Sequence, residues 1–422
     1  MSQPKNGKDV GSANVFRFSQ SGLIVFCLCL ITGASFITSK VAGSRQARAV
    51  GPVLSIPEPD EQDKYTFIRQ GPWGELLTQE ISLQRPAEYL NQELKKVQPA
   101  VWTFHGMNVA QVKALLVANG LPEPEAEKAL APDRVSTQGT NTVFKPSDDF
   151  VFSLNSETRD RLYSALRGLE VNVYLDWPYF YPRDTVESVF ADTRPHPDDL
   201  ALFKQLVYRD KDASRFTDFE TLMGRIPTLE RRLTMTASLA RQPAVLARLC
   251  IRPNTDLDQV AAYWGHAPNV RFADIRPMLE ALKKLPKGGT ISLAFLLPPF
   301  ARERLFTYPL PPAPGEPVPD CHWTTLNFWN VKPDGRLLDP VECGRRLDED
   351  FYLIPRPGKF GDLLVFLDRE SQRRHSAVYL ADDLVFTKNG QSYVRPWMIM
   401  RISDLHALYR DFTITYLRRK NH

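Results

Sequence analysis

An uncharged apolar run near the N-terminus is the clearest feature of the hydrophobic pattern. It extends over residues 22–37 and follows a polar lead that contains Lys5, Lys8 and Arg17. Its length lies between the ~20 residues of a spanning helix and the roughly 7–15 of a signal-peptide core. Two interpretations stay open: an uncleaved single-pass anchor, which we favour, and an export signal cleaved at residues 47–49. Both put the rest of the chain outside the cytoplasm.

Helical and strand-like patterns begin after a polar, proline-containing linker. Residues 108–120 and 155–168 carry apolar side chains at helical spacing, start with an asparagine cap and end at glycine. Residues 171–175 alternate between apolar and polar positions, which predicts a strand. The aromatic run over residues 176–182 is interpreted as a loop packed over the core, with a ligand groove as the less favoured alternative.

The second half of the pattern predicts helices first and strands later. Helical spacing dominates residues 197–286 and includes residues 245–249. A proline-rich stretch, residues 309–319, predicts an extended approach to a helix of about two turns over residues 321–330. The short apolar runs 363–366, 377–380 and 384–386 predict strands. These elements together predict an α+β fold.

Composition and charge narrow the function classes. The 422 residues are 43% hydrophobic and 24% charged, which indicates roughly two or three globular domains of about 100–200 residues. The 53 basic and 49 acidic residues nearly balance, and no long basic run with aromatic residues is present, which argues against a nucleic-acid binder. Five cysteines occur without CxxC pairs or His/Cys ligand spacing, so we expect neither a metal site nor a cofactor.

Cysteine and histidine chemistry concentrates near the C-terminus. Cys321 follows Asp320, an N-cap residue, so its thiolate would feel the positive end of a helix dipole. His375 stands at the start of a predicted strand, where its imidazole can take up the thiol proton. In an oxidising compartment Cys250 and Cys343 are a candidate disulfide pair, which leaves Cys321 as the odd thiol.

Three motifs in this region resemble the NlpC family of papain-like cell-wall cysteine peptidases. They are Asp320-Cys321 at a helix start, Gly361-Asp-Leu-x-x-Phe366, and His375-x-x-x-Tyr379-Leu380. The resemblance covers residues 308–409, with Tyr308 near the place where that family carries a tyrosine. It implies a papain-like α+β domain that hydrolyses amide bonds in peptidoglycan stem peptides. In that domain Cys321 would be the nucleophile, and His375 the general base and acid.

The chain departs from the family pattern around the nucleophile. The family usually has Asp-Cys-Ser-Gly there, whereas His322 and Trp323 follow Cys321 in this chain. The local packing must therefore differ. His322 points elsewhere on the helix and is not expected to be the base. The cysteine-histidine-dependent amidohydrolases are a close alternative within the same fold.

The third polar residue of the site falls within residues 386–390, where no histidine is available. Asn389 is the expected residue, with Thr387 and Lys388 as rivals. Strand alternation puts Thr387 and Asn389 on one face and Lys388 on the other. An amide carbonyl can orient the imidazole without adding charge, whereas an ammonium would repel an imidazolium. We therefore expect Asn389→Ala to impair activity and Lys388→Ala to be nearly neutral.

These inferences give a segment plan and two functions. The segments are a cytoplasmic lead (1–20), a transmembrane or signal segment (21–39), a linker (40–62), a mixed α/β module (63–190), a helical module (191–290) and the NlpC-like domain (291–422). The first function is a hydrolase of peptidoglycan peptides anchored in the inner membrane, with its bulk periplasmic or extracellular, or secreted after cleavage. The alternative is an inactive copy of the domain that serves as an interaction or cell-wall-binding protein.

Overall fold

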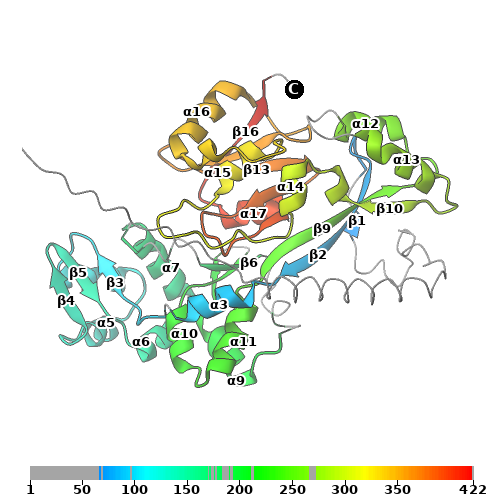
Figure 1. The fold of residues 1–422 in the computed structure, drawn as a ribbon. Helices are drawn as coiled ribbons and strands as arrows, with labels where there is room; N and C mark the ends of the chain where they lie inside the picture. The colour runs from blue at the N-terminus through cyan, green and yellow to red at the C-terminus, as the bar shows by residue number, and fades with distance from the viewer. Residues whose placement is uncertain are drawn as a thin grey trace, which may run out of the picture. The chain divides into compact units, whose positions relative to one another are not determined.

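The computed structural model describes residues 66–67, 70–95, 97–169, 171–172, 175, 178–182, 190, 193–210, 213–265 and 272–420. All of them belong to one compact unit (Figure 1). The predicted lead, membrane segment and linker, residues 1–62, lie outside these described residues. Within the described ranges, no helix has the length and apolar character needed to cross a bilayer.

The described chain is a mixed α+β structure with four antiparallel sheets. In spatial order, a four-stranded sheet contains β1 (Thr66–Phe67), β2 (Glu75–Leu83), β9 (Gln242–Ile251) and β10 (Gly289–Ser292). A six-stranded sheet contains β11 (Phe351–Ile354), β16 (Thr413–Arg419), β12 (Leu363–Leu367), β13 (Arg373–Ala381), β14 (Leu384–Lys388) and β15 (Trp397–Arg401). Two three-stranded sheets contain β3 (Trp102–Phe104), β5 (Asn141–Phe144) and β4 (Val135–Gln138), and β6 (Tyr179–Pro182), β8 (Ala213–Phe216) and β7 (Tyr208–Asp210).

Helices connect and cover these sheets. They are α3 (Ala87–Leu94), α4 (Val109–Ala118), α5 (Glu123–Ala129), α6 (Asp148–Ser153), α7 (Ser156–Arg167), α9 (Pro197–Leu206), α10 (Phe219–Arg225), α11 (Leu229–Leu239), α12 (Leu257–Trp264), α13 (Phe272–Lys283), α14 (Pro299–Arg304), α15 (Cys321–Asn327), α16 (Pro340–Asp350) and α17 (Ile402–Leu408). The predicted helices at residues 108–120 and 155–168 are confirmed as α4 and α7. Asn108 forms a capping box with Gln111, and Asn155 caps α7.

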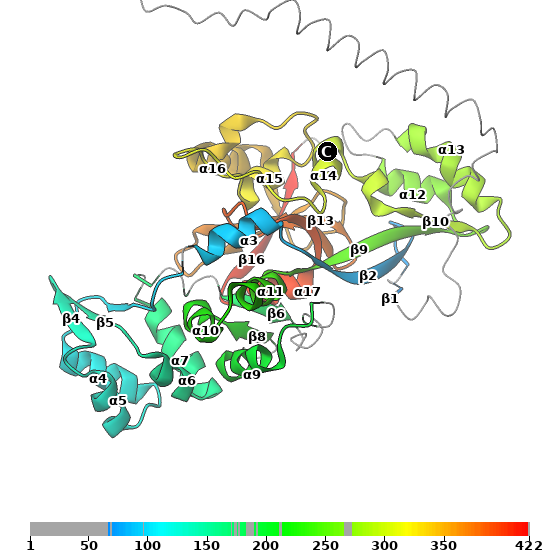
Figure 2. The ribbon, with the colours of Figure 1, turned by 60° about the horizontal axis from the view of Figure 1, so that its bottom comes forward.

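The helix expected over residues 245–249 is wrong, because this segment is the centre of strand β9. The strand pairs with β2 from Glu75↔Cys250 to Leu83↔Gln242, and with β10 on its other side (Figure 2). Side chains from both faces of the strand are buried, with Val245, Ala247 and Leu249 in one hydrophobic cluster and Ala244 in another, so its apolar residues form a run without a period of two. Such a run cannot be distinguished from a buried helix by periodicity.

The aromatic run and the segment before it also differ from expectation. Residues 171, 172 and 175 belong to no strand, and residues 173–174 lie outside the described part of the chain. The strand is instead β6, within the segment predicted to be a loop. Tyr179 pairs with Phe216 and Pro182 with Ala213 of β8. Aromatic residues have high strand propensity, and proline is tolerated here because β6 is an edge strand.

Two hydrophobic cores divide the chain differently from the predicted modules. One cluster of buried side chains runs from Trp102 to Leu239 and thus crosses the predicted boundary between residues 190 and 191. A second cluster joins Leu76 of β2 to side chains between Val245 and Ile399. The segment 191–290 is therefore not a separate helical module, since its first half packs with the preceding residues and β9 packs with β2.

The first core contains a buried ion pair. Arg159 of α7 is fully buried, and its Nε lies 3.1 Å from Oδ2 of Asp218. The guanidinium also donates to the carbonyl oxygens of Gln205, at 2.9 Å, and Val151. Tyr163 donates its hydroxyl proton to Asp218. Burial raises the pKa of Asp218 to about 6 although the Arg159 charge opposes this shift.

The six-stranded sheet has one face toward α15 and the other toward α17. Alternate residues of β13 follow this division: Val378 and Leu380 pack in the second core, whereas Ala377 and Tyr379 pack in a third cluster with residues of α17. Both helices can be followed beside the sheet in Figure 1. The chemistry expected at residues 321–389 therefore depends on which face each side chain takes.

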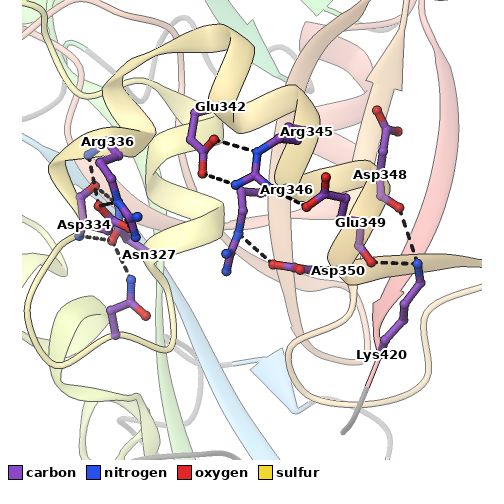
Figure 3. Close-up of polar contacts among 11 residues, drawn as sticks. Asn327, Asp334, Arg336, Glu342, Arg345, Arg346, Asp348, Glu349, Asp350 and Lys420 are labelled. Carbon is purple, nitrogen blue, oxygen red and sulfur yellow. Dashed lines mark hydrogen bonds and ion pairs between the residues drawn. The ribbon is translucent and has the colours of Figure 1, made fainter.

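Helix α16 carries ion pairs between its own residues and is joined by a hydrogen bond to Lys420, the last described residue (Figure 3). Arg346 lies 2.7 Å from Asp350, and Arg345 pairs with Glu342 at 2.6 Å. The Lys420 ammonium donates to the carbonyl oxygen of Glu349 at 2.7 Å. The ion-paired side chains are partly exposed, and pairs near the surface contribute about 0–1 kcal/mol each, so we assign them a structural role.

Candidate functional site

Cys321 is the first residue of α15, as the sequence predicts. The Asp320 side chain accepts a hydrogen bond from the backbone N–H of Trp323 at 2.7 Å, which caps the helix. The preceding segment, residues 309–319, is free of helix and strand. Helix α15 packs on β13 and β14, so its N-terminus brings the thiol to the ends of these strands.

The Gly361-Asp362 motif positions the strand that pairs with β13. Gly361 has φ +94°, and a Cβ there would lie 2.1 Å from the Trp329 ring, so only glycine fits. Asp362 stabilises this turn: its Oδ2 accepts from the backbone N–H groups of Gly358 and Lys359, each at 2.8 Å. The carboxylate also pairs with Arg418 of β16 at 2.7 Å. This turn fixes where β12 starts.

The Cys321 thiol is buried and protonated at rest. Only 3% of the residue is exposed, and burial raises the pKa of the thiol to about 12, with the Asp320 carboxylate adding to the rise. Three groups oppose that rise: a hydrogen bond from the backbone N–H of Ser376, the charge of Lys388 and the backbone N–H of His322. Cys321 therefore needs a base before it can act as a nucleophile.

His375 is completely buried and has one ring nitrogen held and the other free. Nε2 lies 3.0 Å from the hydroxyl oxygen of Thr387, whereas Nδ1 has no hydrogen-bond partner. The ring stacks on Tyr409, with centroids 4.2 Å apart and planes at 14°. Burial lowers the pKa of His375 well below its usual value, and the charges of His322 and Lys388 lower it further. The imidazole is therefore neutral at rest.

Thr387 and Asn389 together select the tautomer of His375. The Thr387 hydroxyl donates to Oδ1 of Asn389 at 3.5 Å, and the Asn389 amide nitrogen lies 3.1 Å from the sulfur of Met400. Because the only hydroxyl proton of Thr387 is used in this way, its oxygen accepts the Nε2–H of His375. The Nδ1 lone pair is then free to accept a proton, which is the state a general base needs.

The predicted alternation of β14 is confirmed, but the contact with His375 comes from a different residue than expected. Thr387 and Asn389 share a face, and Thr387 rather than Asn389 touches the imidazole. Asn389 lies one hydrogen bond further away. Lys388 takes the other face with Trp397, its neighbour on β15.

Cys321 begins the helix that covers the Ser376 face of β13. On the α15 side, Ser376 donates to Thr325 at 3.0 Å, and the Nδ1 of His322 lies 2.9 Å from the Ser376 hydroxyl. His375 precedes Ser376 and points to the α17 side, against Phe366 and Tyr409. The pairing of β13 with β14 ends at Val378↔Phe386, before both residues are reached.

Groups from both faces respond to the charge of Cys321. Its thiolate would raise the pKa of Tyr409 on one side and the pKa of Lys388 on the other. The structure thus brings Cys321 and His375 to the same strand ends, but no hydrogen bond joins them. In chemical terms the site holds a neutral thiol at the start of α15 and, on the neighbouring strand β13, a neutral imidazole whose Nδ1 lone pair is free.

The other two cysteines that the structure describes form no disulfide, and the Tyr308 hydroxyl makes no hydrogen bond. Cys250 and Cys343 are free thiols, so the disulfide considered for them is wrong. Cys250 lies inside β9, and Cys343 donates its S–H to the carbonyl of Leu337 at 3.0 Å. Tyr308 lies edge-on to Tyr89 of α3, with centroids 6.3 Å apart. In the part of the chain that the structure describes, no group of His, Cys, Asp and Glu has the arrangement of a metal site.

Sequence reasoning missed Tyr409 and the closeness of Lys388 to Cys321. Tyr409 follows α17 and carries no motif, so its stacking on His375 has no local signal. Lys388 was excluded by the expected repulsion of an imidazolium, a criterion that ignored the thiolate. A buried strand containing a lysine was the available clue, because lysine is almost never fully buried without a reason.

Comparison with known proteins adds no relative: no family model, curated protein or solved structure matches this chain. The functional conclusion therefore depends on the motifs at residues 320–389 and on the geometry around them. Fold analogy supplies no independent support for it.

Proposed function

We propose that the C-terminal region is a papain-like, NlpC-type thiol hydrolase that cleaves amide bonds in peptidoglycan stem peptides. The observation that carries the proposal is His375: its Nε2 is held by Thr387 while its buried Nδ1 has no partner. Other buried side-chain atoms of the described residues also lack a partner, among them the Tyr308 hydroxyl and the Trp323 indole nitrogen, but Nδ1 is the basic atom of an imidazole whose other nitrogen is held. Cys321 begins α15, which packs on the strand that carries His375, and its thiol is the proposed proton donor.

The proposed reaction has two halves. Nδ1 of His375 accepts the Cys321 thiol proton, and the sulfur attacks the carbonyl carbon of the amide. His375 returns the proton to the leaving amine nitrogen as the C–N bond breaks, and a thioester remains on Cys321. His375 then deprotonates a water molecule, which attacks the thioester and releases the carboxylic acid and the thiol.

The location proposed for this enzyme follows from the apolar run over residues 22–37. Residues 21–39 would anchor the chain in the inner membrane, or direct its export, with the hydrolase on the side of the cell wall. Protease added to intact spheroplasts should digest residues 66–420. Complete protection would contradict this location.

Substrate class is tested with purified full-length protein and defined fragments. Peptidoglycan stem peptides, alone and cross-linked, should be cleaved by the wild type at an amide bond, and Cys321→Ala should release no product above background. Mass spectrometry of the products identifies the bond. Cleavage of unrelated peptides at equal rates would retain a thiol hydrolase but contradict the substrate class.

The orienting role of Thr387 gives a second prediction. Thr387→Val removes the hydroxyl that holds Nε2 at nearly constant volume, so kcat should fall on the order of a hundredfold while the protein stays folded. Thr387→Ser retains the hydroxyl and should recover most of the rate. Asn389→Ala acts one hydrogen bond further away and should cost less than Thr387→Val. A larger loss for Asn389→Ala would restore Asn389 as the residue that orients the imidazole.

A specific observation favours the alternative of an inactive, interacting domain. Cys321 is nearly inaccessible, its pKa is raised to about 12 by burial, and it makes no hydrogen bond to His375. An inert structural thiol has these properties. Binding of the stem peptides without any cleavage, unchanged by Cys321→Ala, would support this alternative.

A further inference from the structure

Lys388 is a fully buried lysine at the end of β14. Its ammonium nitrogen donates to the carbonyl oxygens of Gly390, at 2.8 Å, and Ser392, at 2.9 Å. Neither acceptor carries a formal charge. A buried cation is expensive unless an anion or a functional need accompanies it, so the two carbonyl groups alone do not explain why a lysine is retained here.

Lys388 faces the helix that begins with Cys321. It pairs with Trp397 of β15, whose indole N–H donates to the Thr324 hydroxyl of α15 at 2.9 Å. Extending the register Val378↔Phe386 places Lys388 opposite Ser376, the residue whose N–H reaches the Cys321 sulfur. The lysine and the thiol therefore lie on the same side of the sheet, at the same strand ends.

The charges around Lys388 fit a partnership with a thiolate. Burial lowers the pKa of Lys388 to about 7, the charges of Cys321 and Asp320 on α15 raise it, and Arg395 lowers it. The effect is mutual, because the charge of Lys388 lowers the pKa of Cys321. Lys388 also lowers the pKa of His375, which points to the opposite face of the sheet. An imidazolium formed there is then a stronger acid toward a leaving amine.

We propose that Lys388 is the cationic partner of the Cys321 thiolate, a positioning residue that stabilises the nucleophile after its proton has passed to His375. The assignment rests on the proposed function and extends it from a Cys–His pair to a Cys–His–Lys cluster. Lys388 itself exchanges no atom with the substrate. Its ammonium offsets the negative charge that would otherwise be isolated among apolar side chains.

The test measures the thiol itself and needs no peptidoglycan. Full-length wild type and Lys388→Met are treated with iodoacetamide over a range of pH, and mass spectrometry follows alkylation of the Cys321 peptide. An opposite charge nearby changes a pKa by about 1–3 units, so below pH 7 the variant should react at least about tenfold more slowly. The difference should shrink above pH 7, where Lys388 of the wild type loses its proton.

The controls separate charge from packing. Lys388→Arg keeps the cation and should recover most of the reactivity, and Lys359→Met, the same change at an exposed lysine, should leave it unchanged. Loosening of residues 389–392 in Lys388→Met would expose the thiol and speed alkylation at every pH. Three results would overturn the assignment. Lys388→Met could be alkylated as fast as the wild type or faster, its alkylation rate could be lower by the same factor at every pH, or Cys321 of the wild type could fail to react at all. If alkylation follows the expected pH profile but the protein does not cleave stem peptides, the result would contradict the proposed substrate and leave the role of Lys388 standing.

Discussion

Alanine at either Cys321 or His375 is expected to reduce stem-peptide cleavage by at least about a thousandfold, and the double variant should be little worse than either single one. Residues that act as a unit are strongly non-additive, because the base has no function without the nucleophile. Initial rates of the four proteins at saturating substrate give the comparison directly. Effects that multiply would show that the two residues act independently and would contradict the proposed reaction.

Cys343 provides the matched control for these variants. It is a buried thiol in the same region, and its S–H is used by the Leu337 carbonyl. Cys343→Ala should lower stability modestly while kcat stays within a few-fold of the wild type. A loss of activity equal to that of Cys321→Ala would mean that thiol removal acts through folding.

The largest stability effect is expected in the first core, where Asp218→Ala should reduce the free energy of unfolding by about 3–5 kcal/mol. The substitution leaves the Arg159 guanidinium buried without its counter-charge, and a guanidinium does not release its proton to escape the cost. Arg159→Met should cost less, because Asp218 can take up a proton. Urea denaturation measures both.

An exposed ion pair serves as the control for this prediction. Arg225 of α10 pairs with Asp148 and Asp149 near the surface, so Arg225→Met should change stability by less than about 1 kcal/mol. If Asp218→Ala and Arg225→Met reduce the free energy of unfolding equally, burial of the Arg159–Asp218 pair does not increase the cost of breaking it.

The pKa of Asp218 also determines how its contribution to the free energy of unfolding changes with pH. Its folded-state pKa of about 6 lies above the reference value of 3.8, so the native state binds the proton more tightly than the unfolded state. The stabilisation from this group is therefore complete below about pH 4 and is lost as the pH rises through about 6. In Asp218→Asn, the free energy of unfolding should lack this decrease between about pH 4 and pH 6, and urea denaturation at several pH values measures the difference.

The parts of the fold that could be predicted are those determined by residues close together in the sequence. Asp320 caps α15 through its own side chain, and the strands β12, β13 and β14 have short apolar runs bounded by turn residues. Caps and turns involve residues a few positions apart, so a single sequence is sufficient to find them.

The parts that were not predictable depend on distant neighbours. Strand β9 pairs with β2 and β10, and its two faces pack in separate clusters; nothing within residues 242–251 specifies those partners. The choice of Thr387 over Asn389 follows from where β13 and β14 stop pairing. The role proposed for Lys388 depends on its position facing α15, which lies more than sixty positions earlier in the chain.

The central claim is that Cys321 forms a covalent bond with the substrate, and acid-quenched mass spectrometry during turnover tests it most directly. Wild-type protein mixed with a cleavable stem peptide should carry the acyl part of that peptide as a thioester on the fragment containing Cys321, and the adduct should disappear as substrate is exhausted. Cleavage that continues in Cys321→Ala, or an acyl group found on a different residue, would contradict the account.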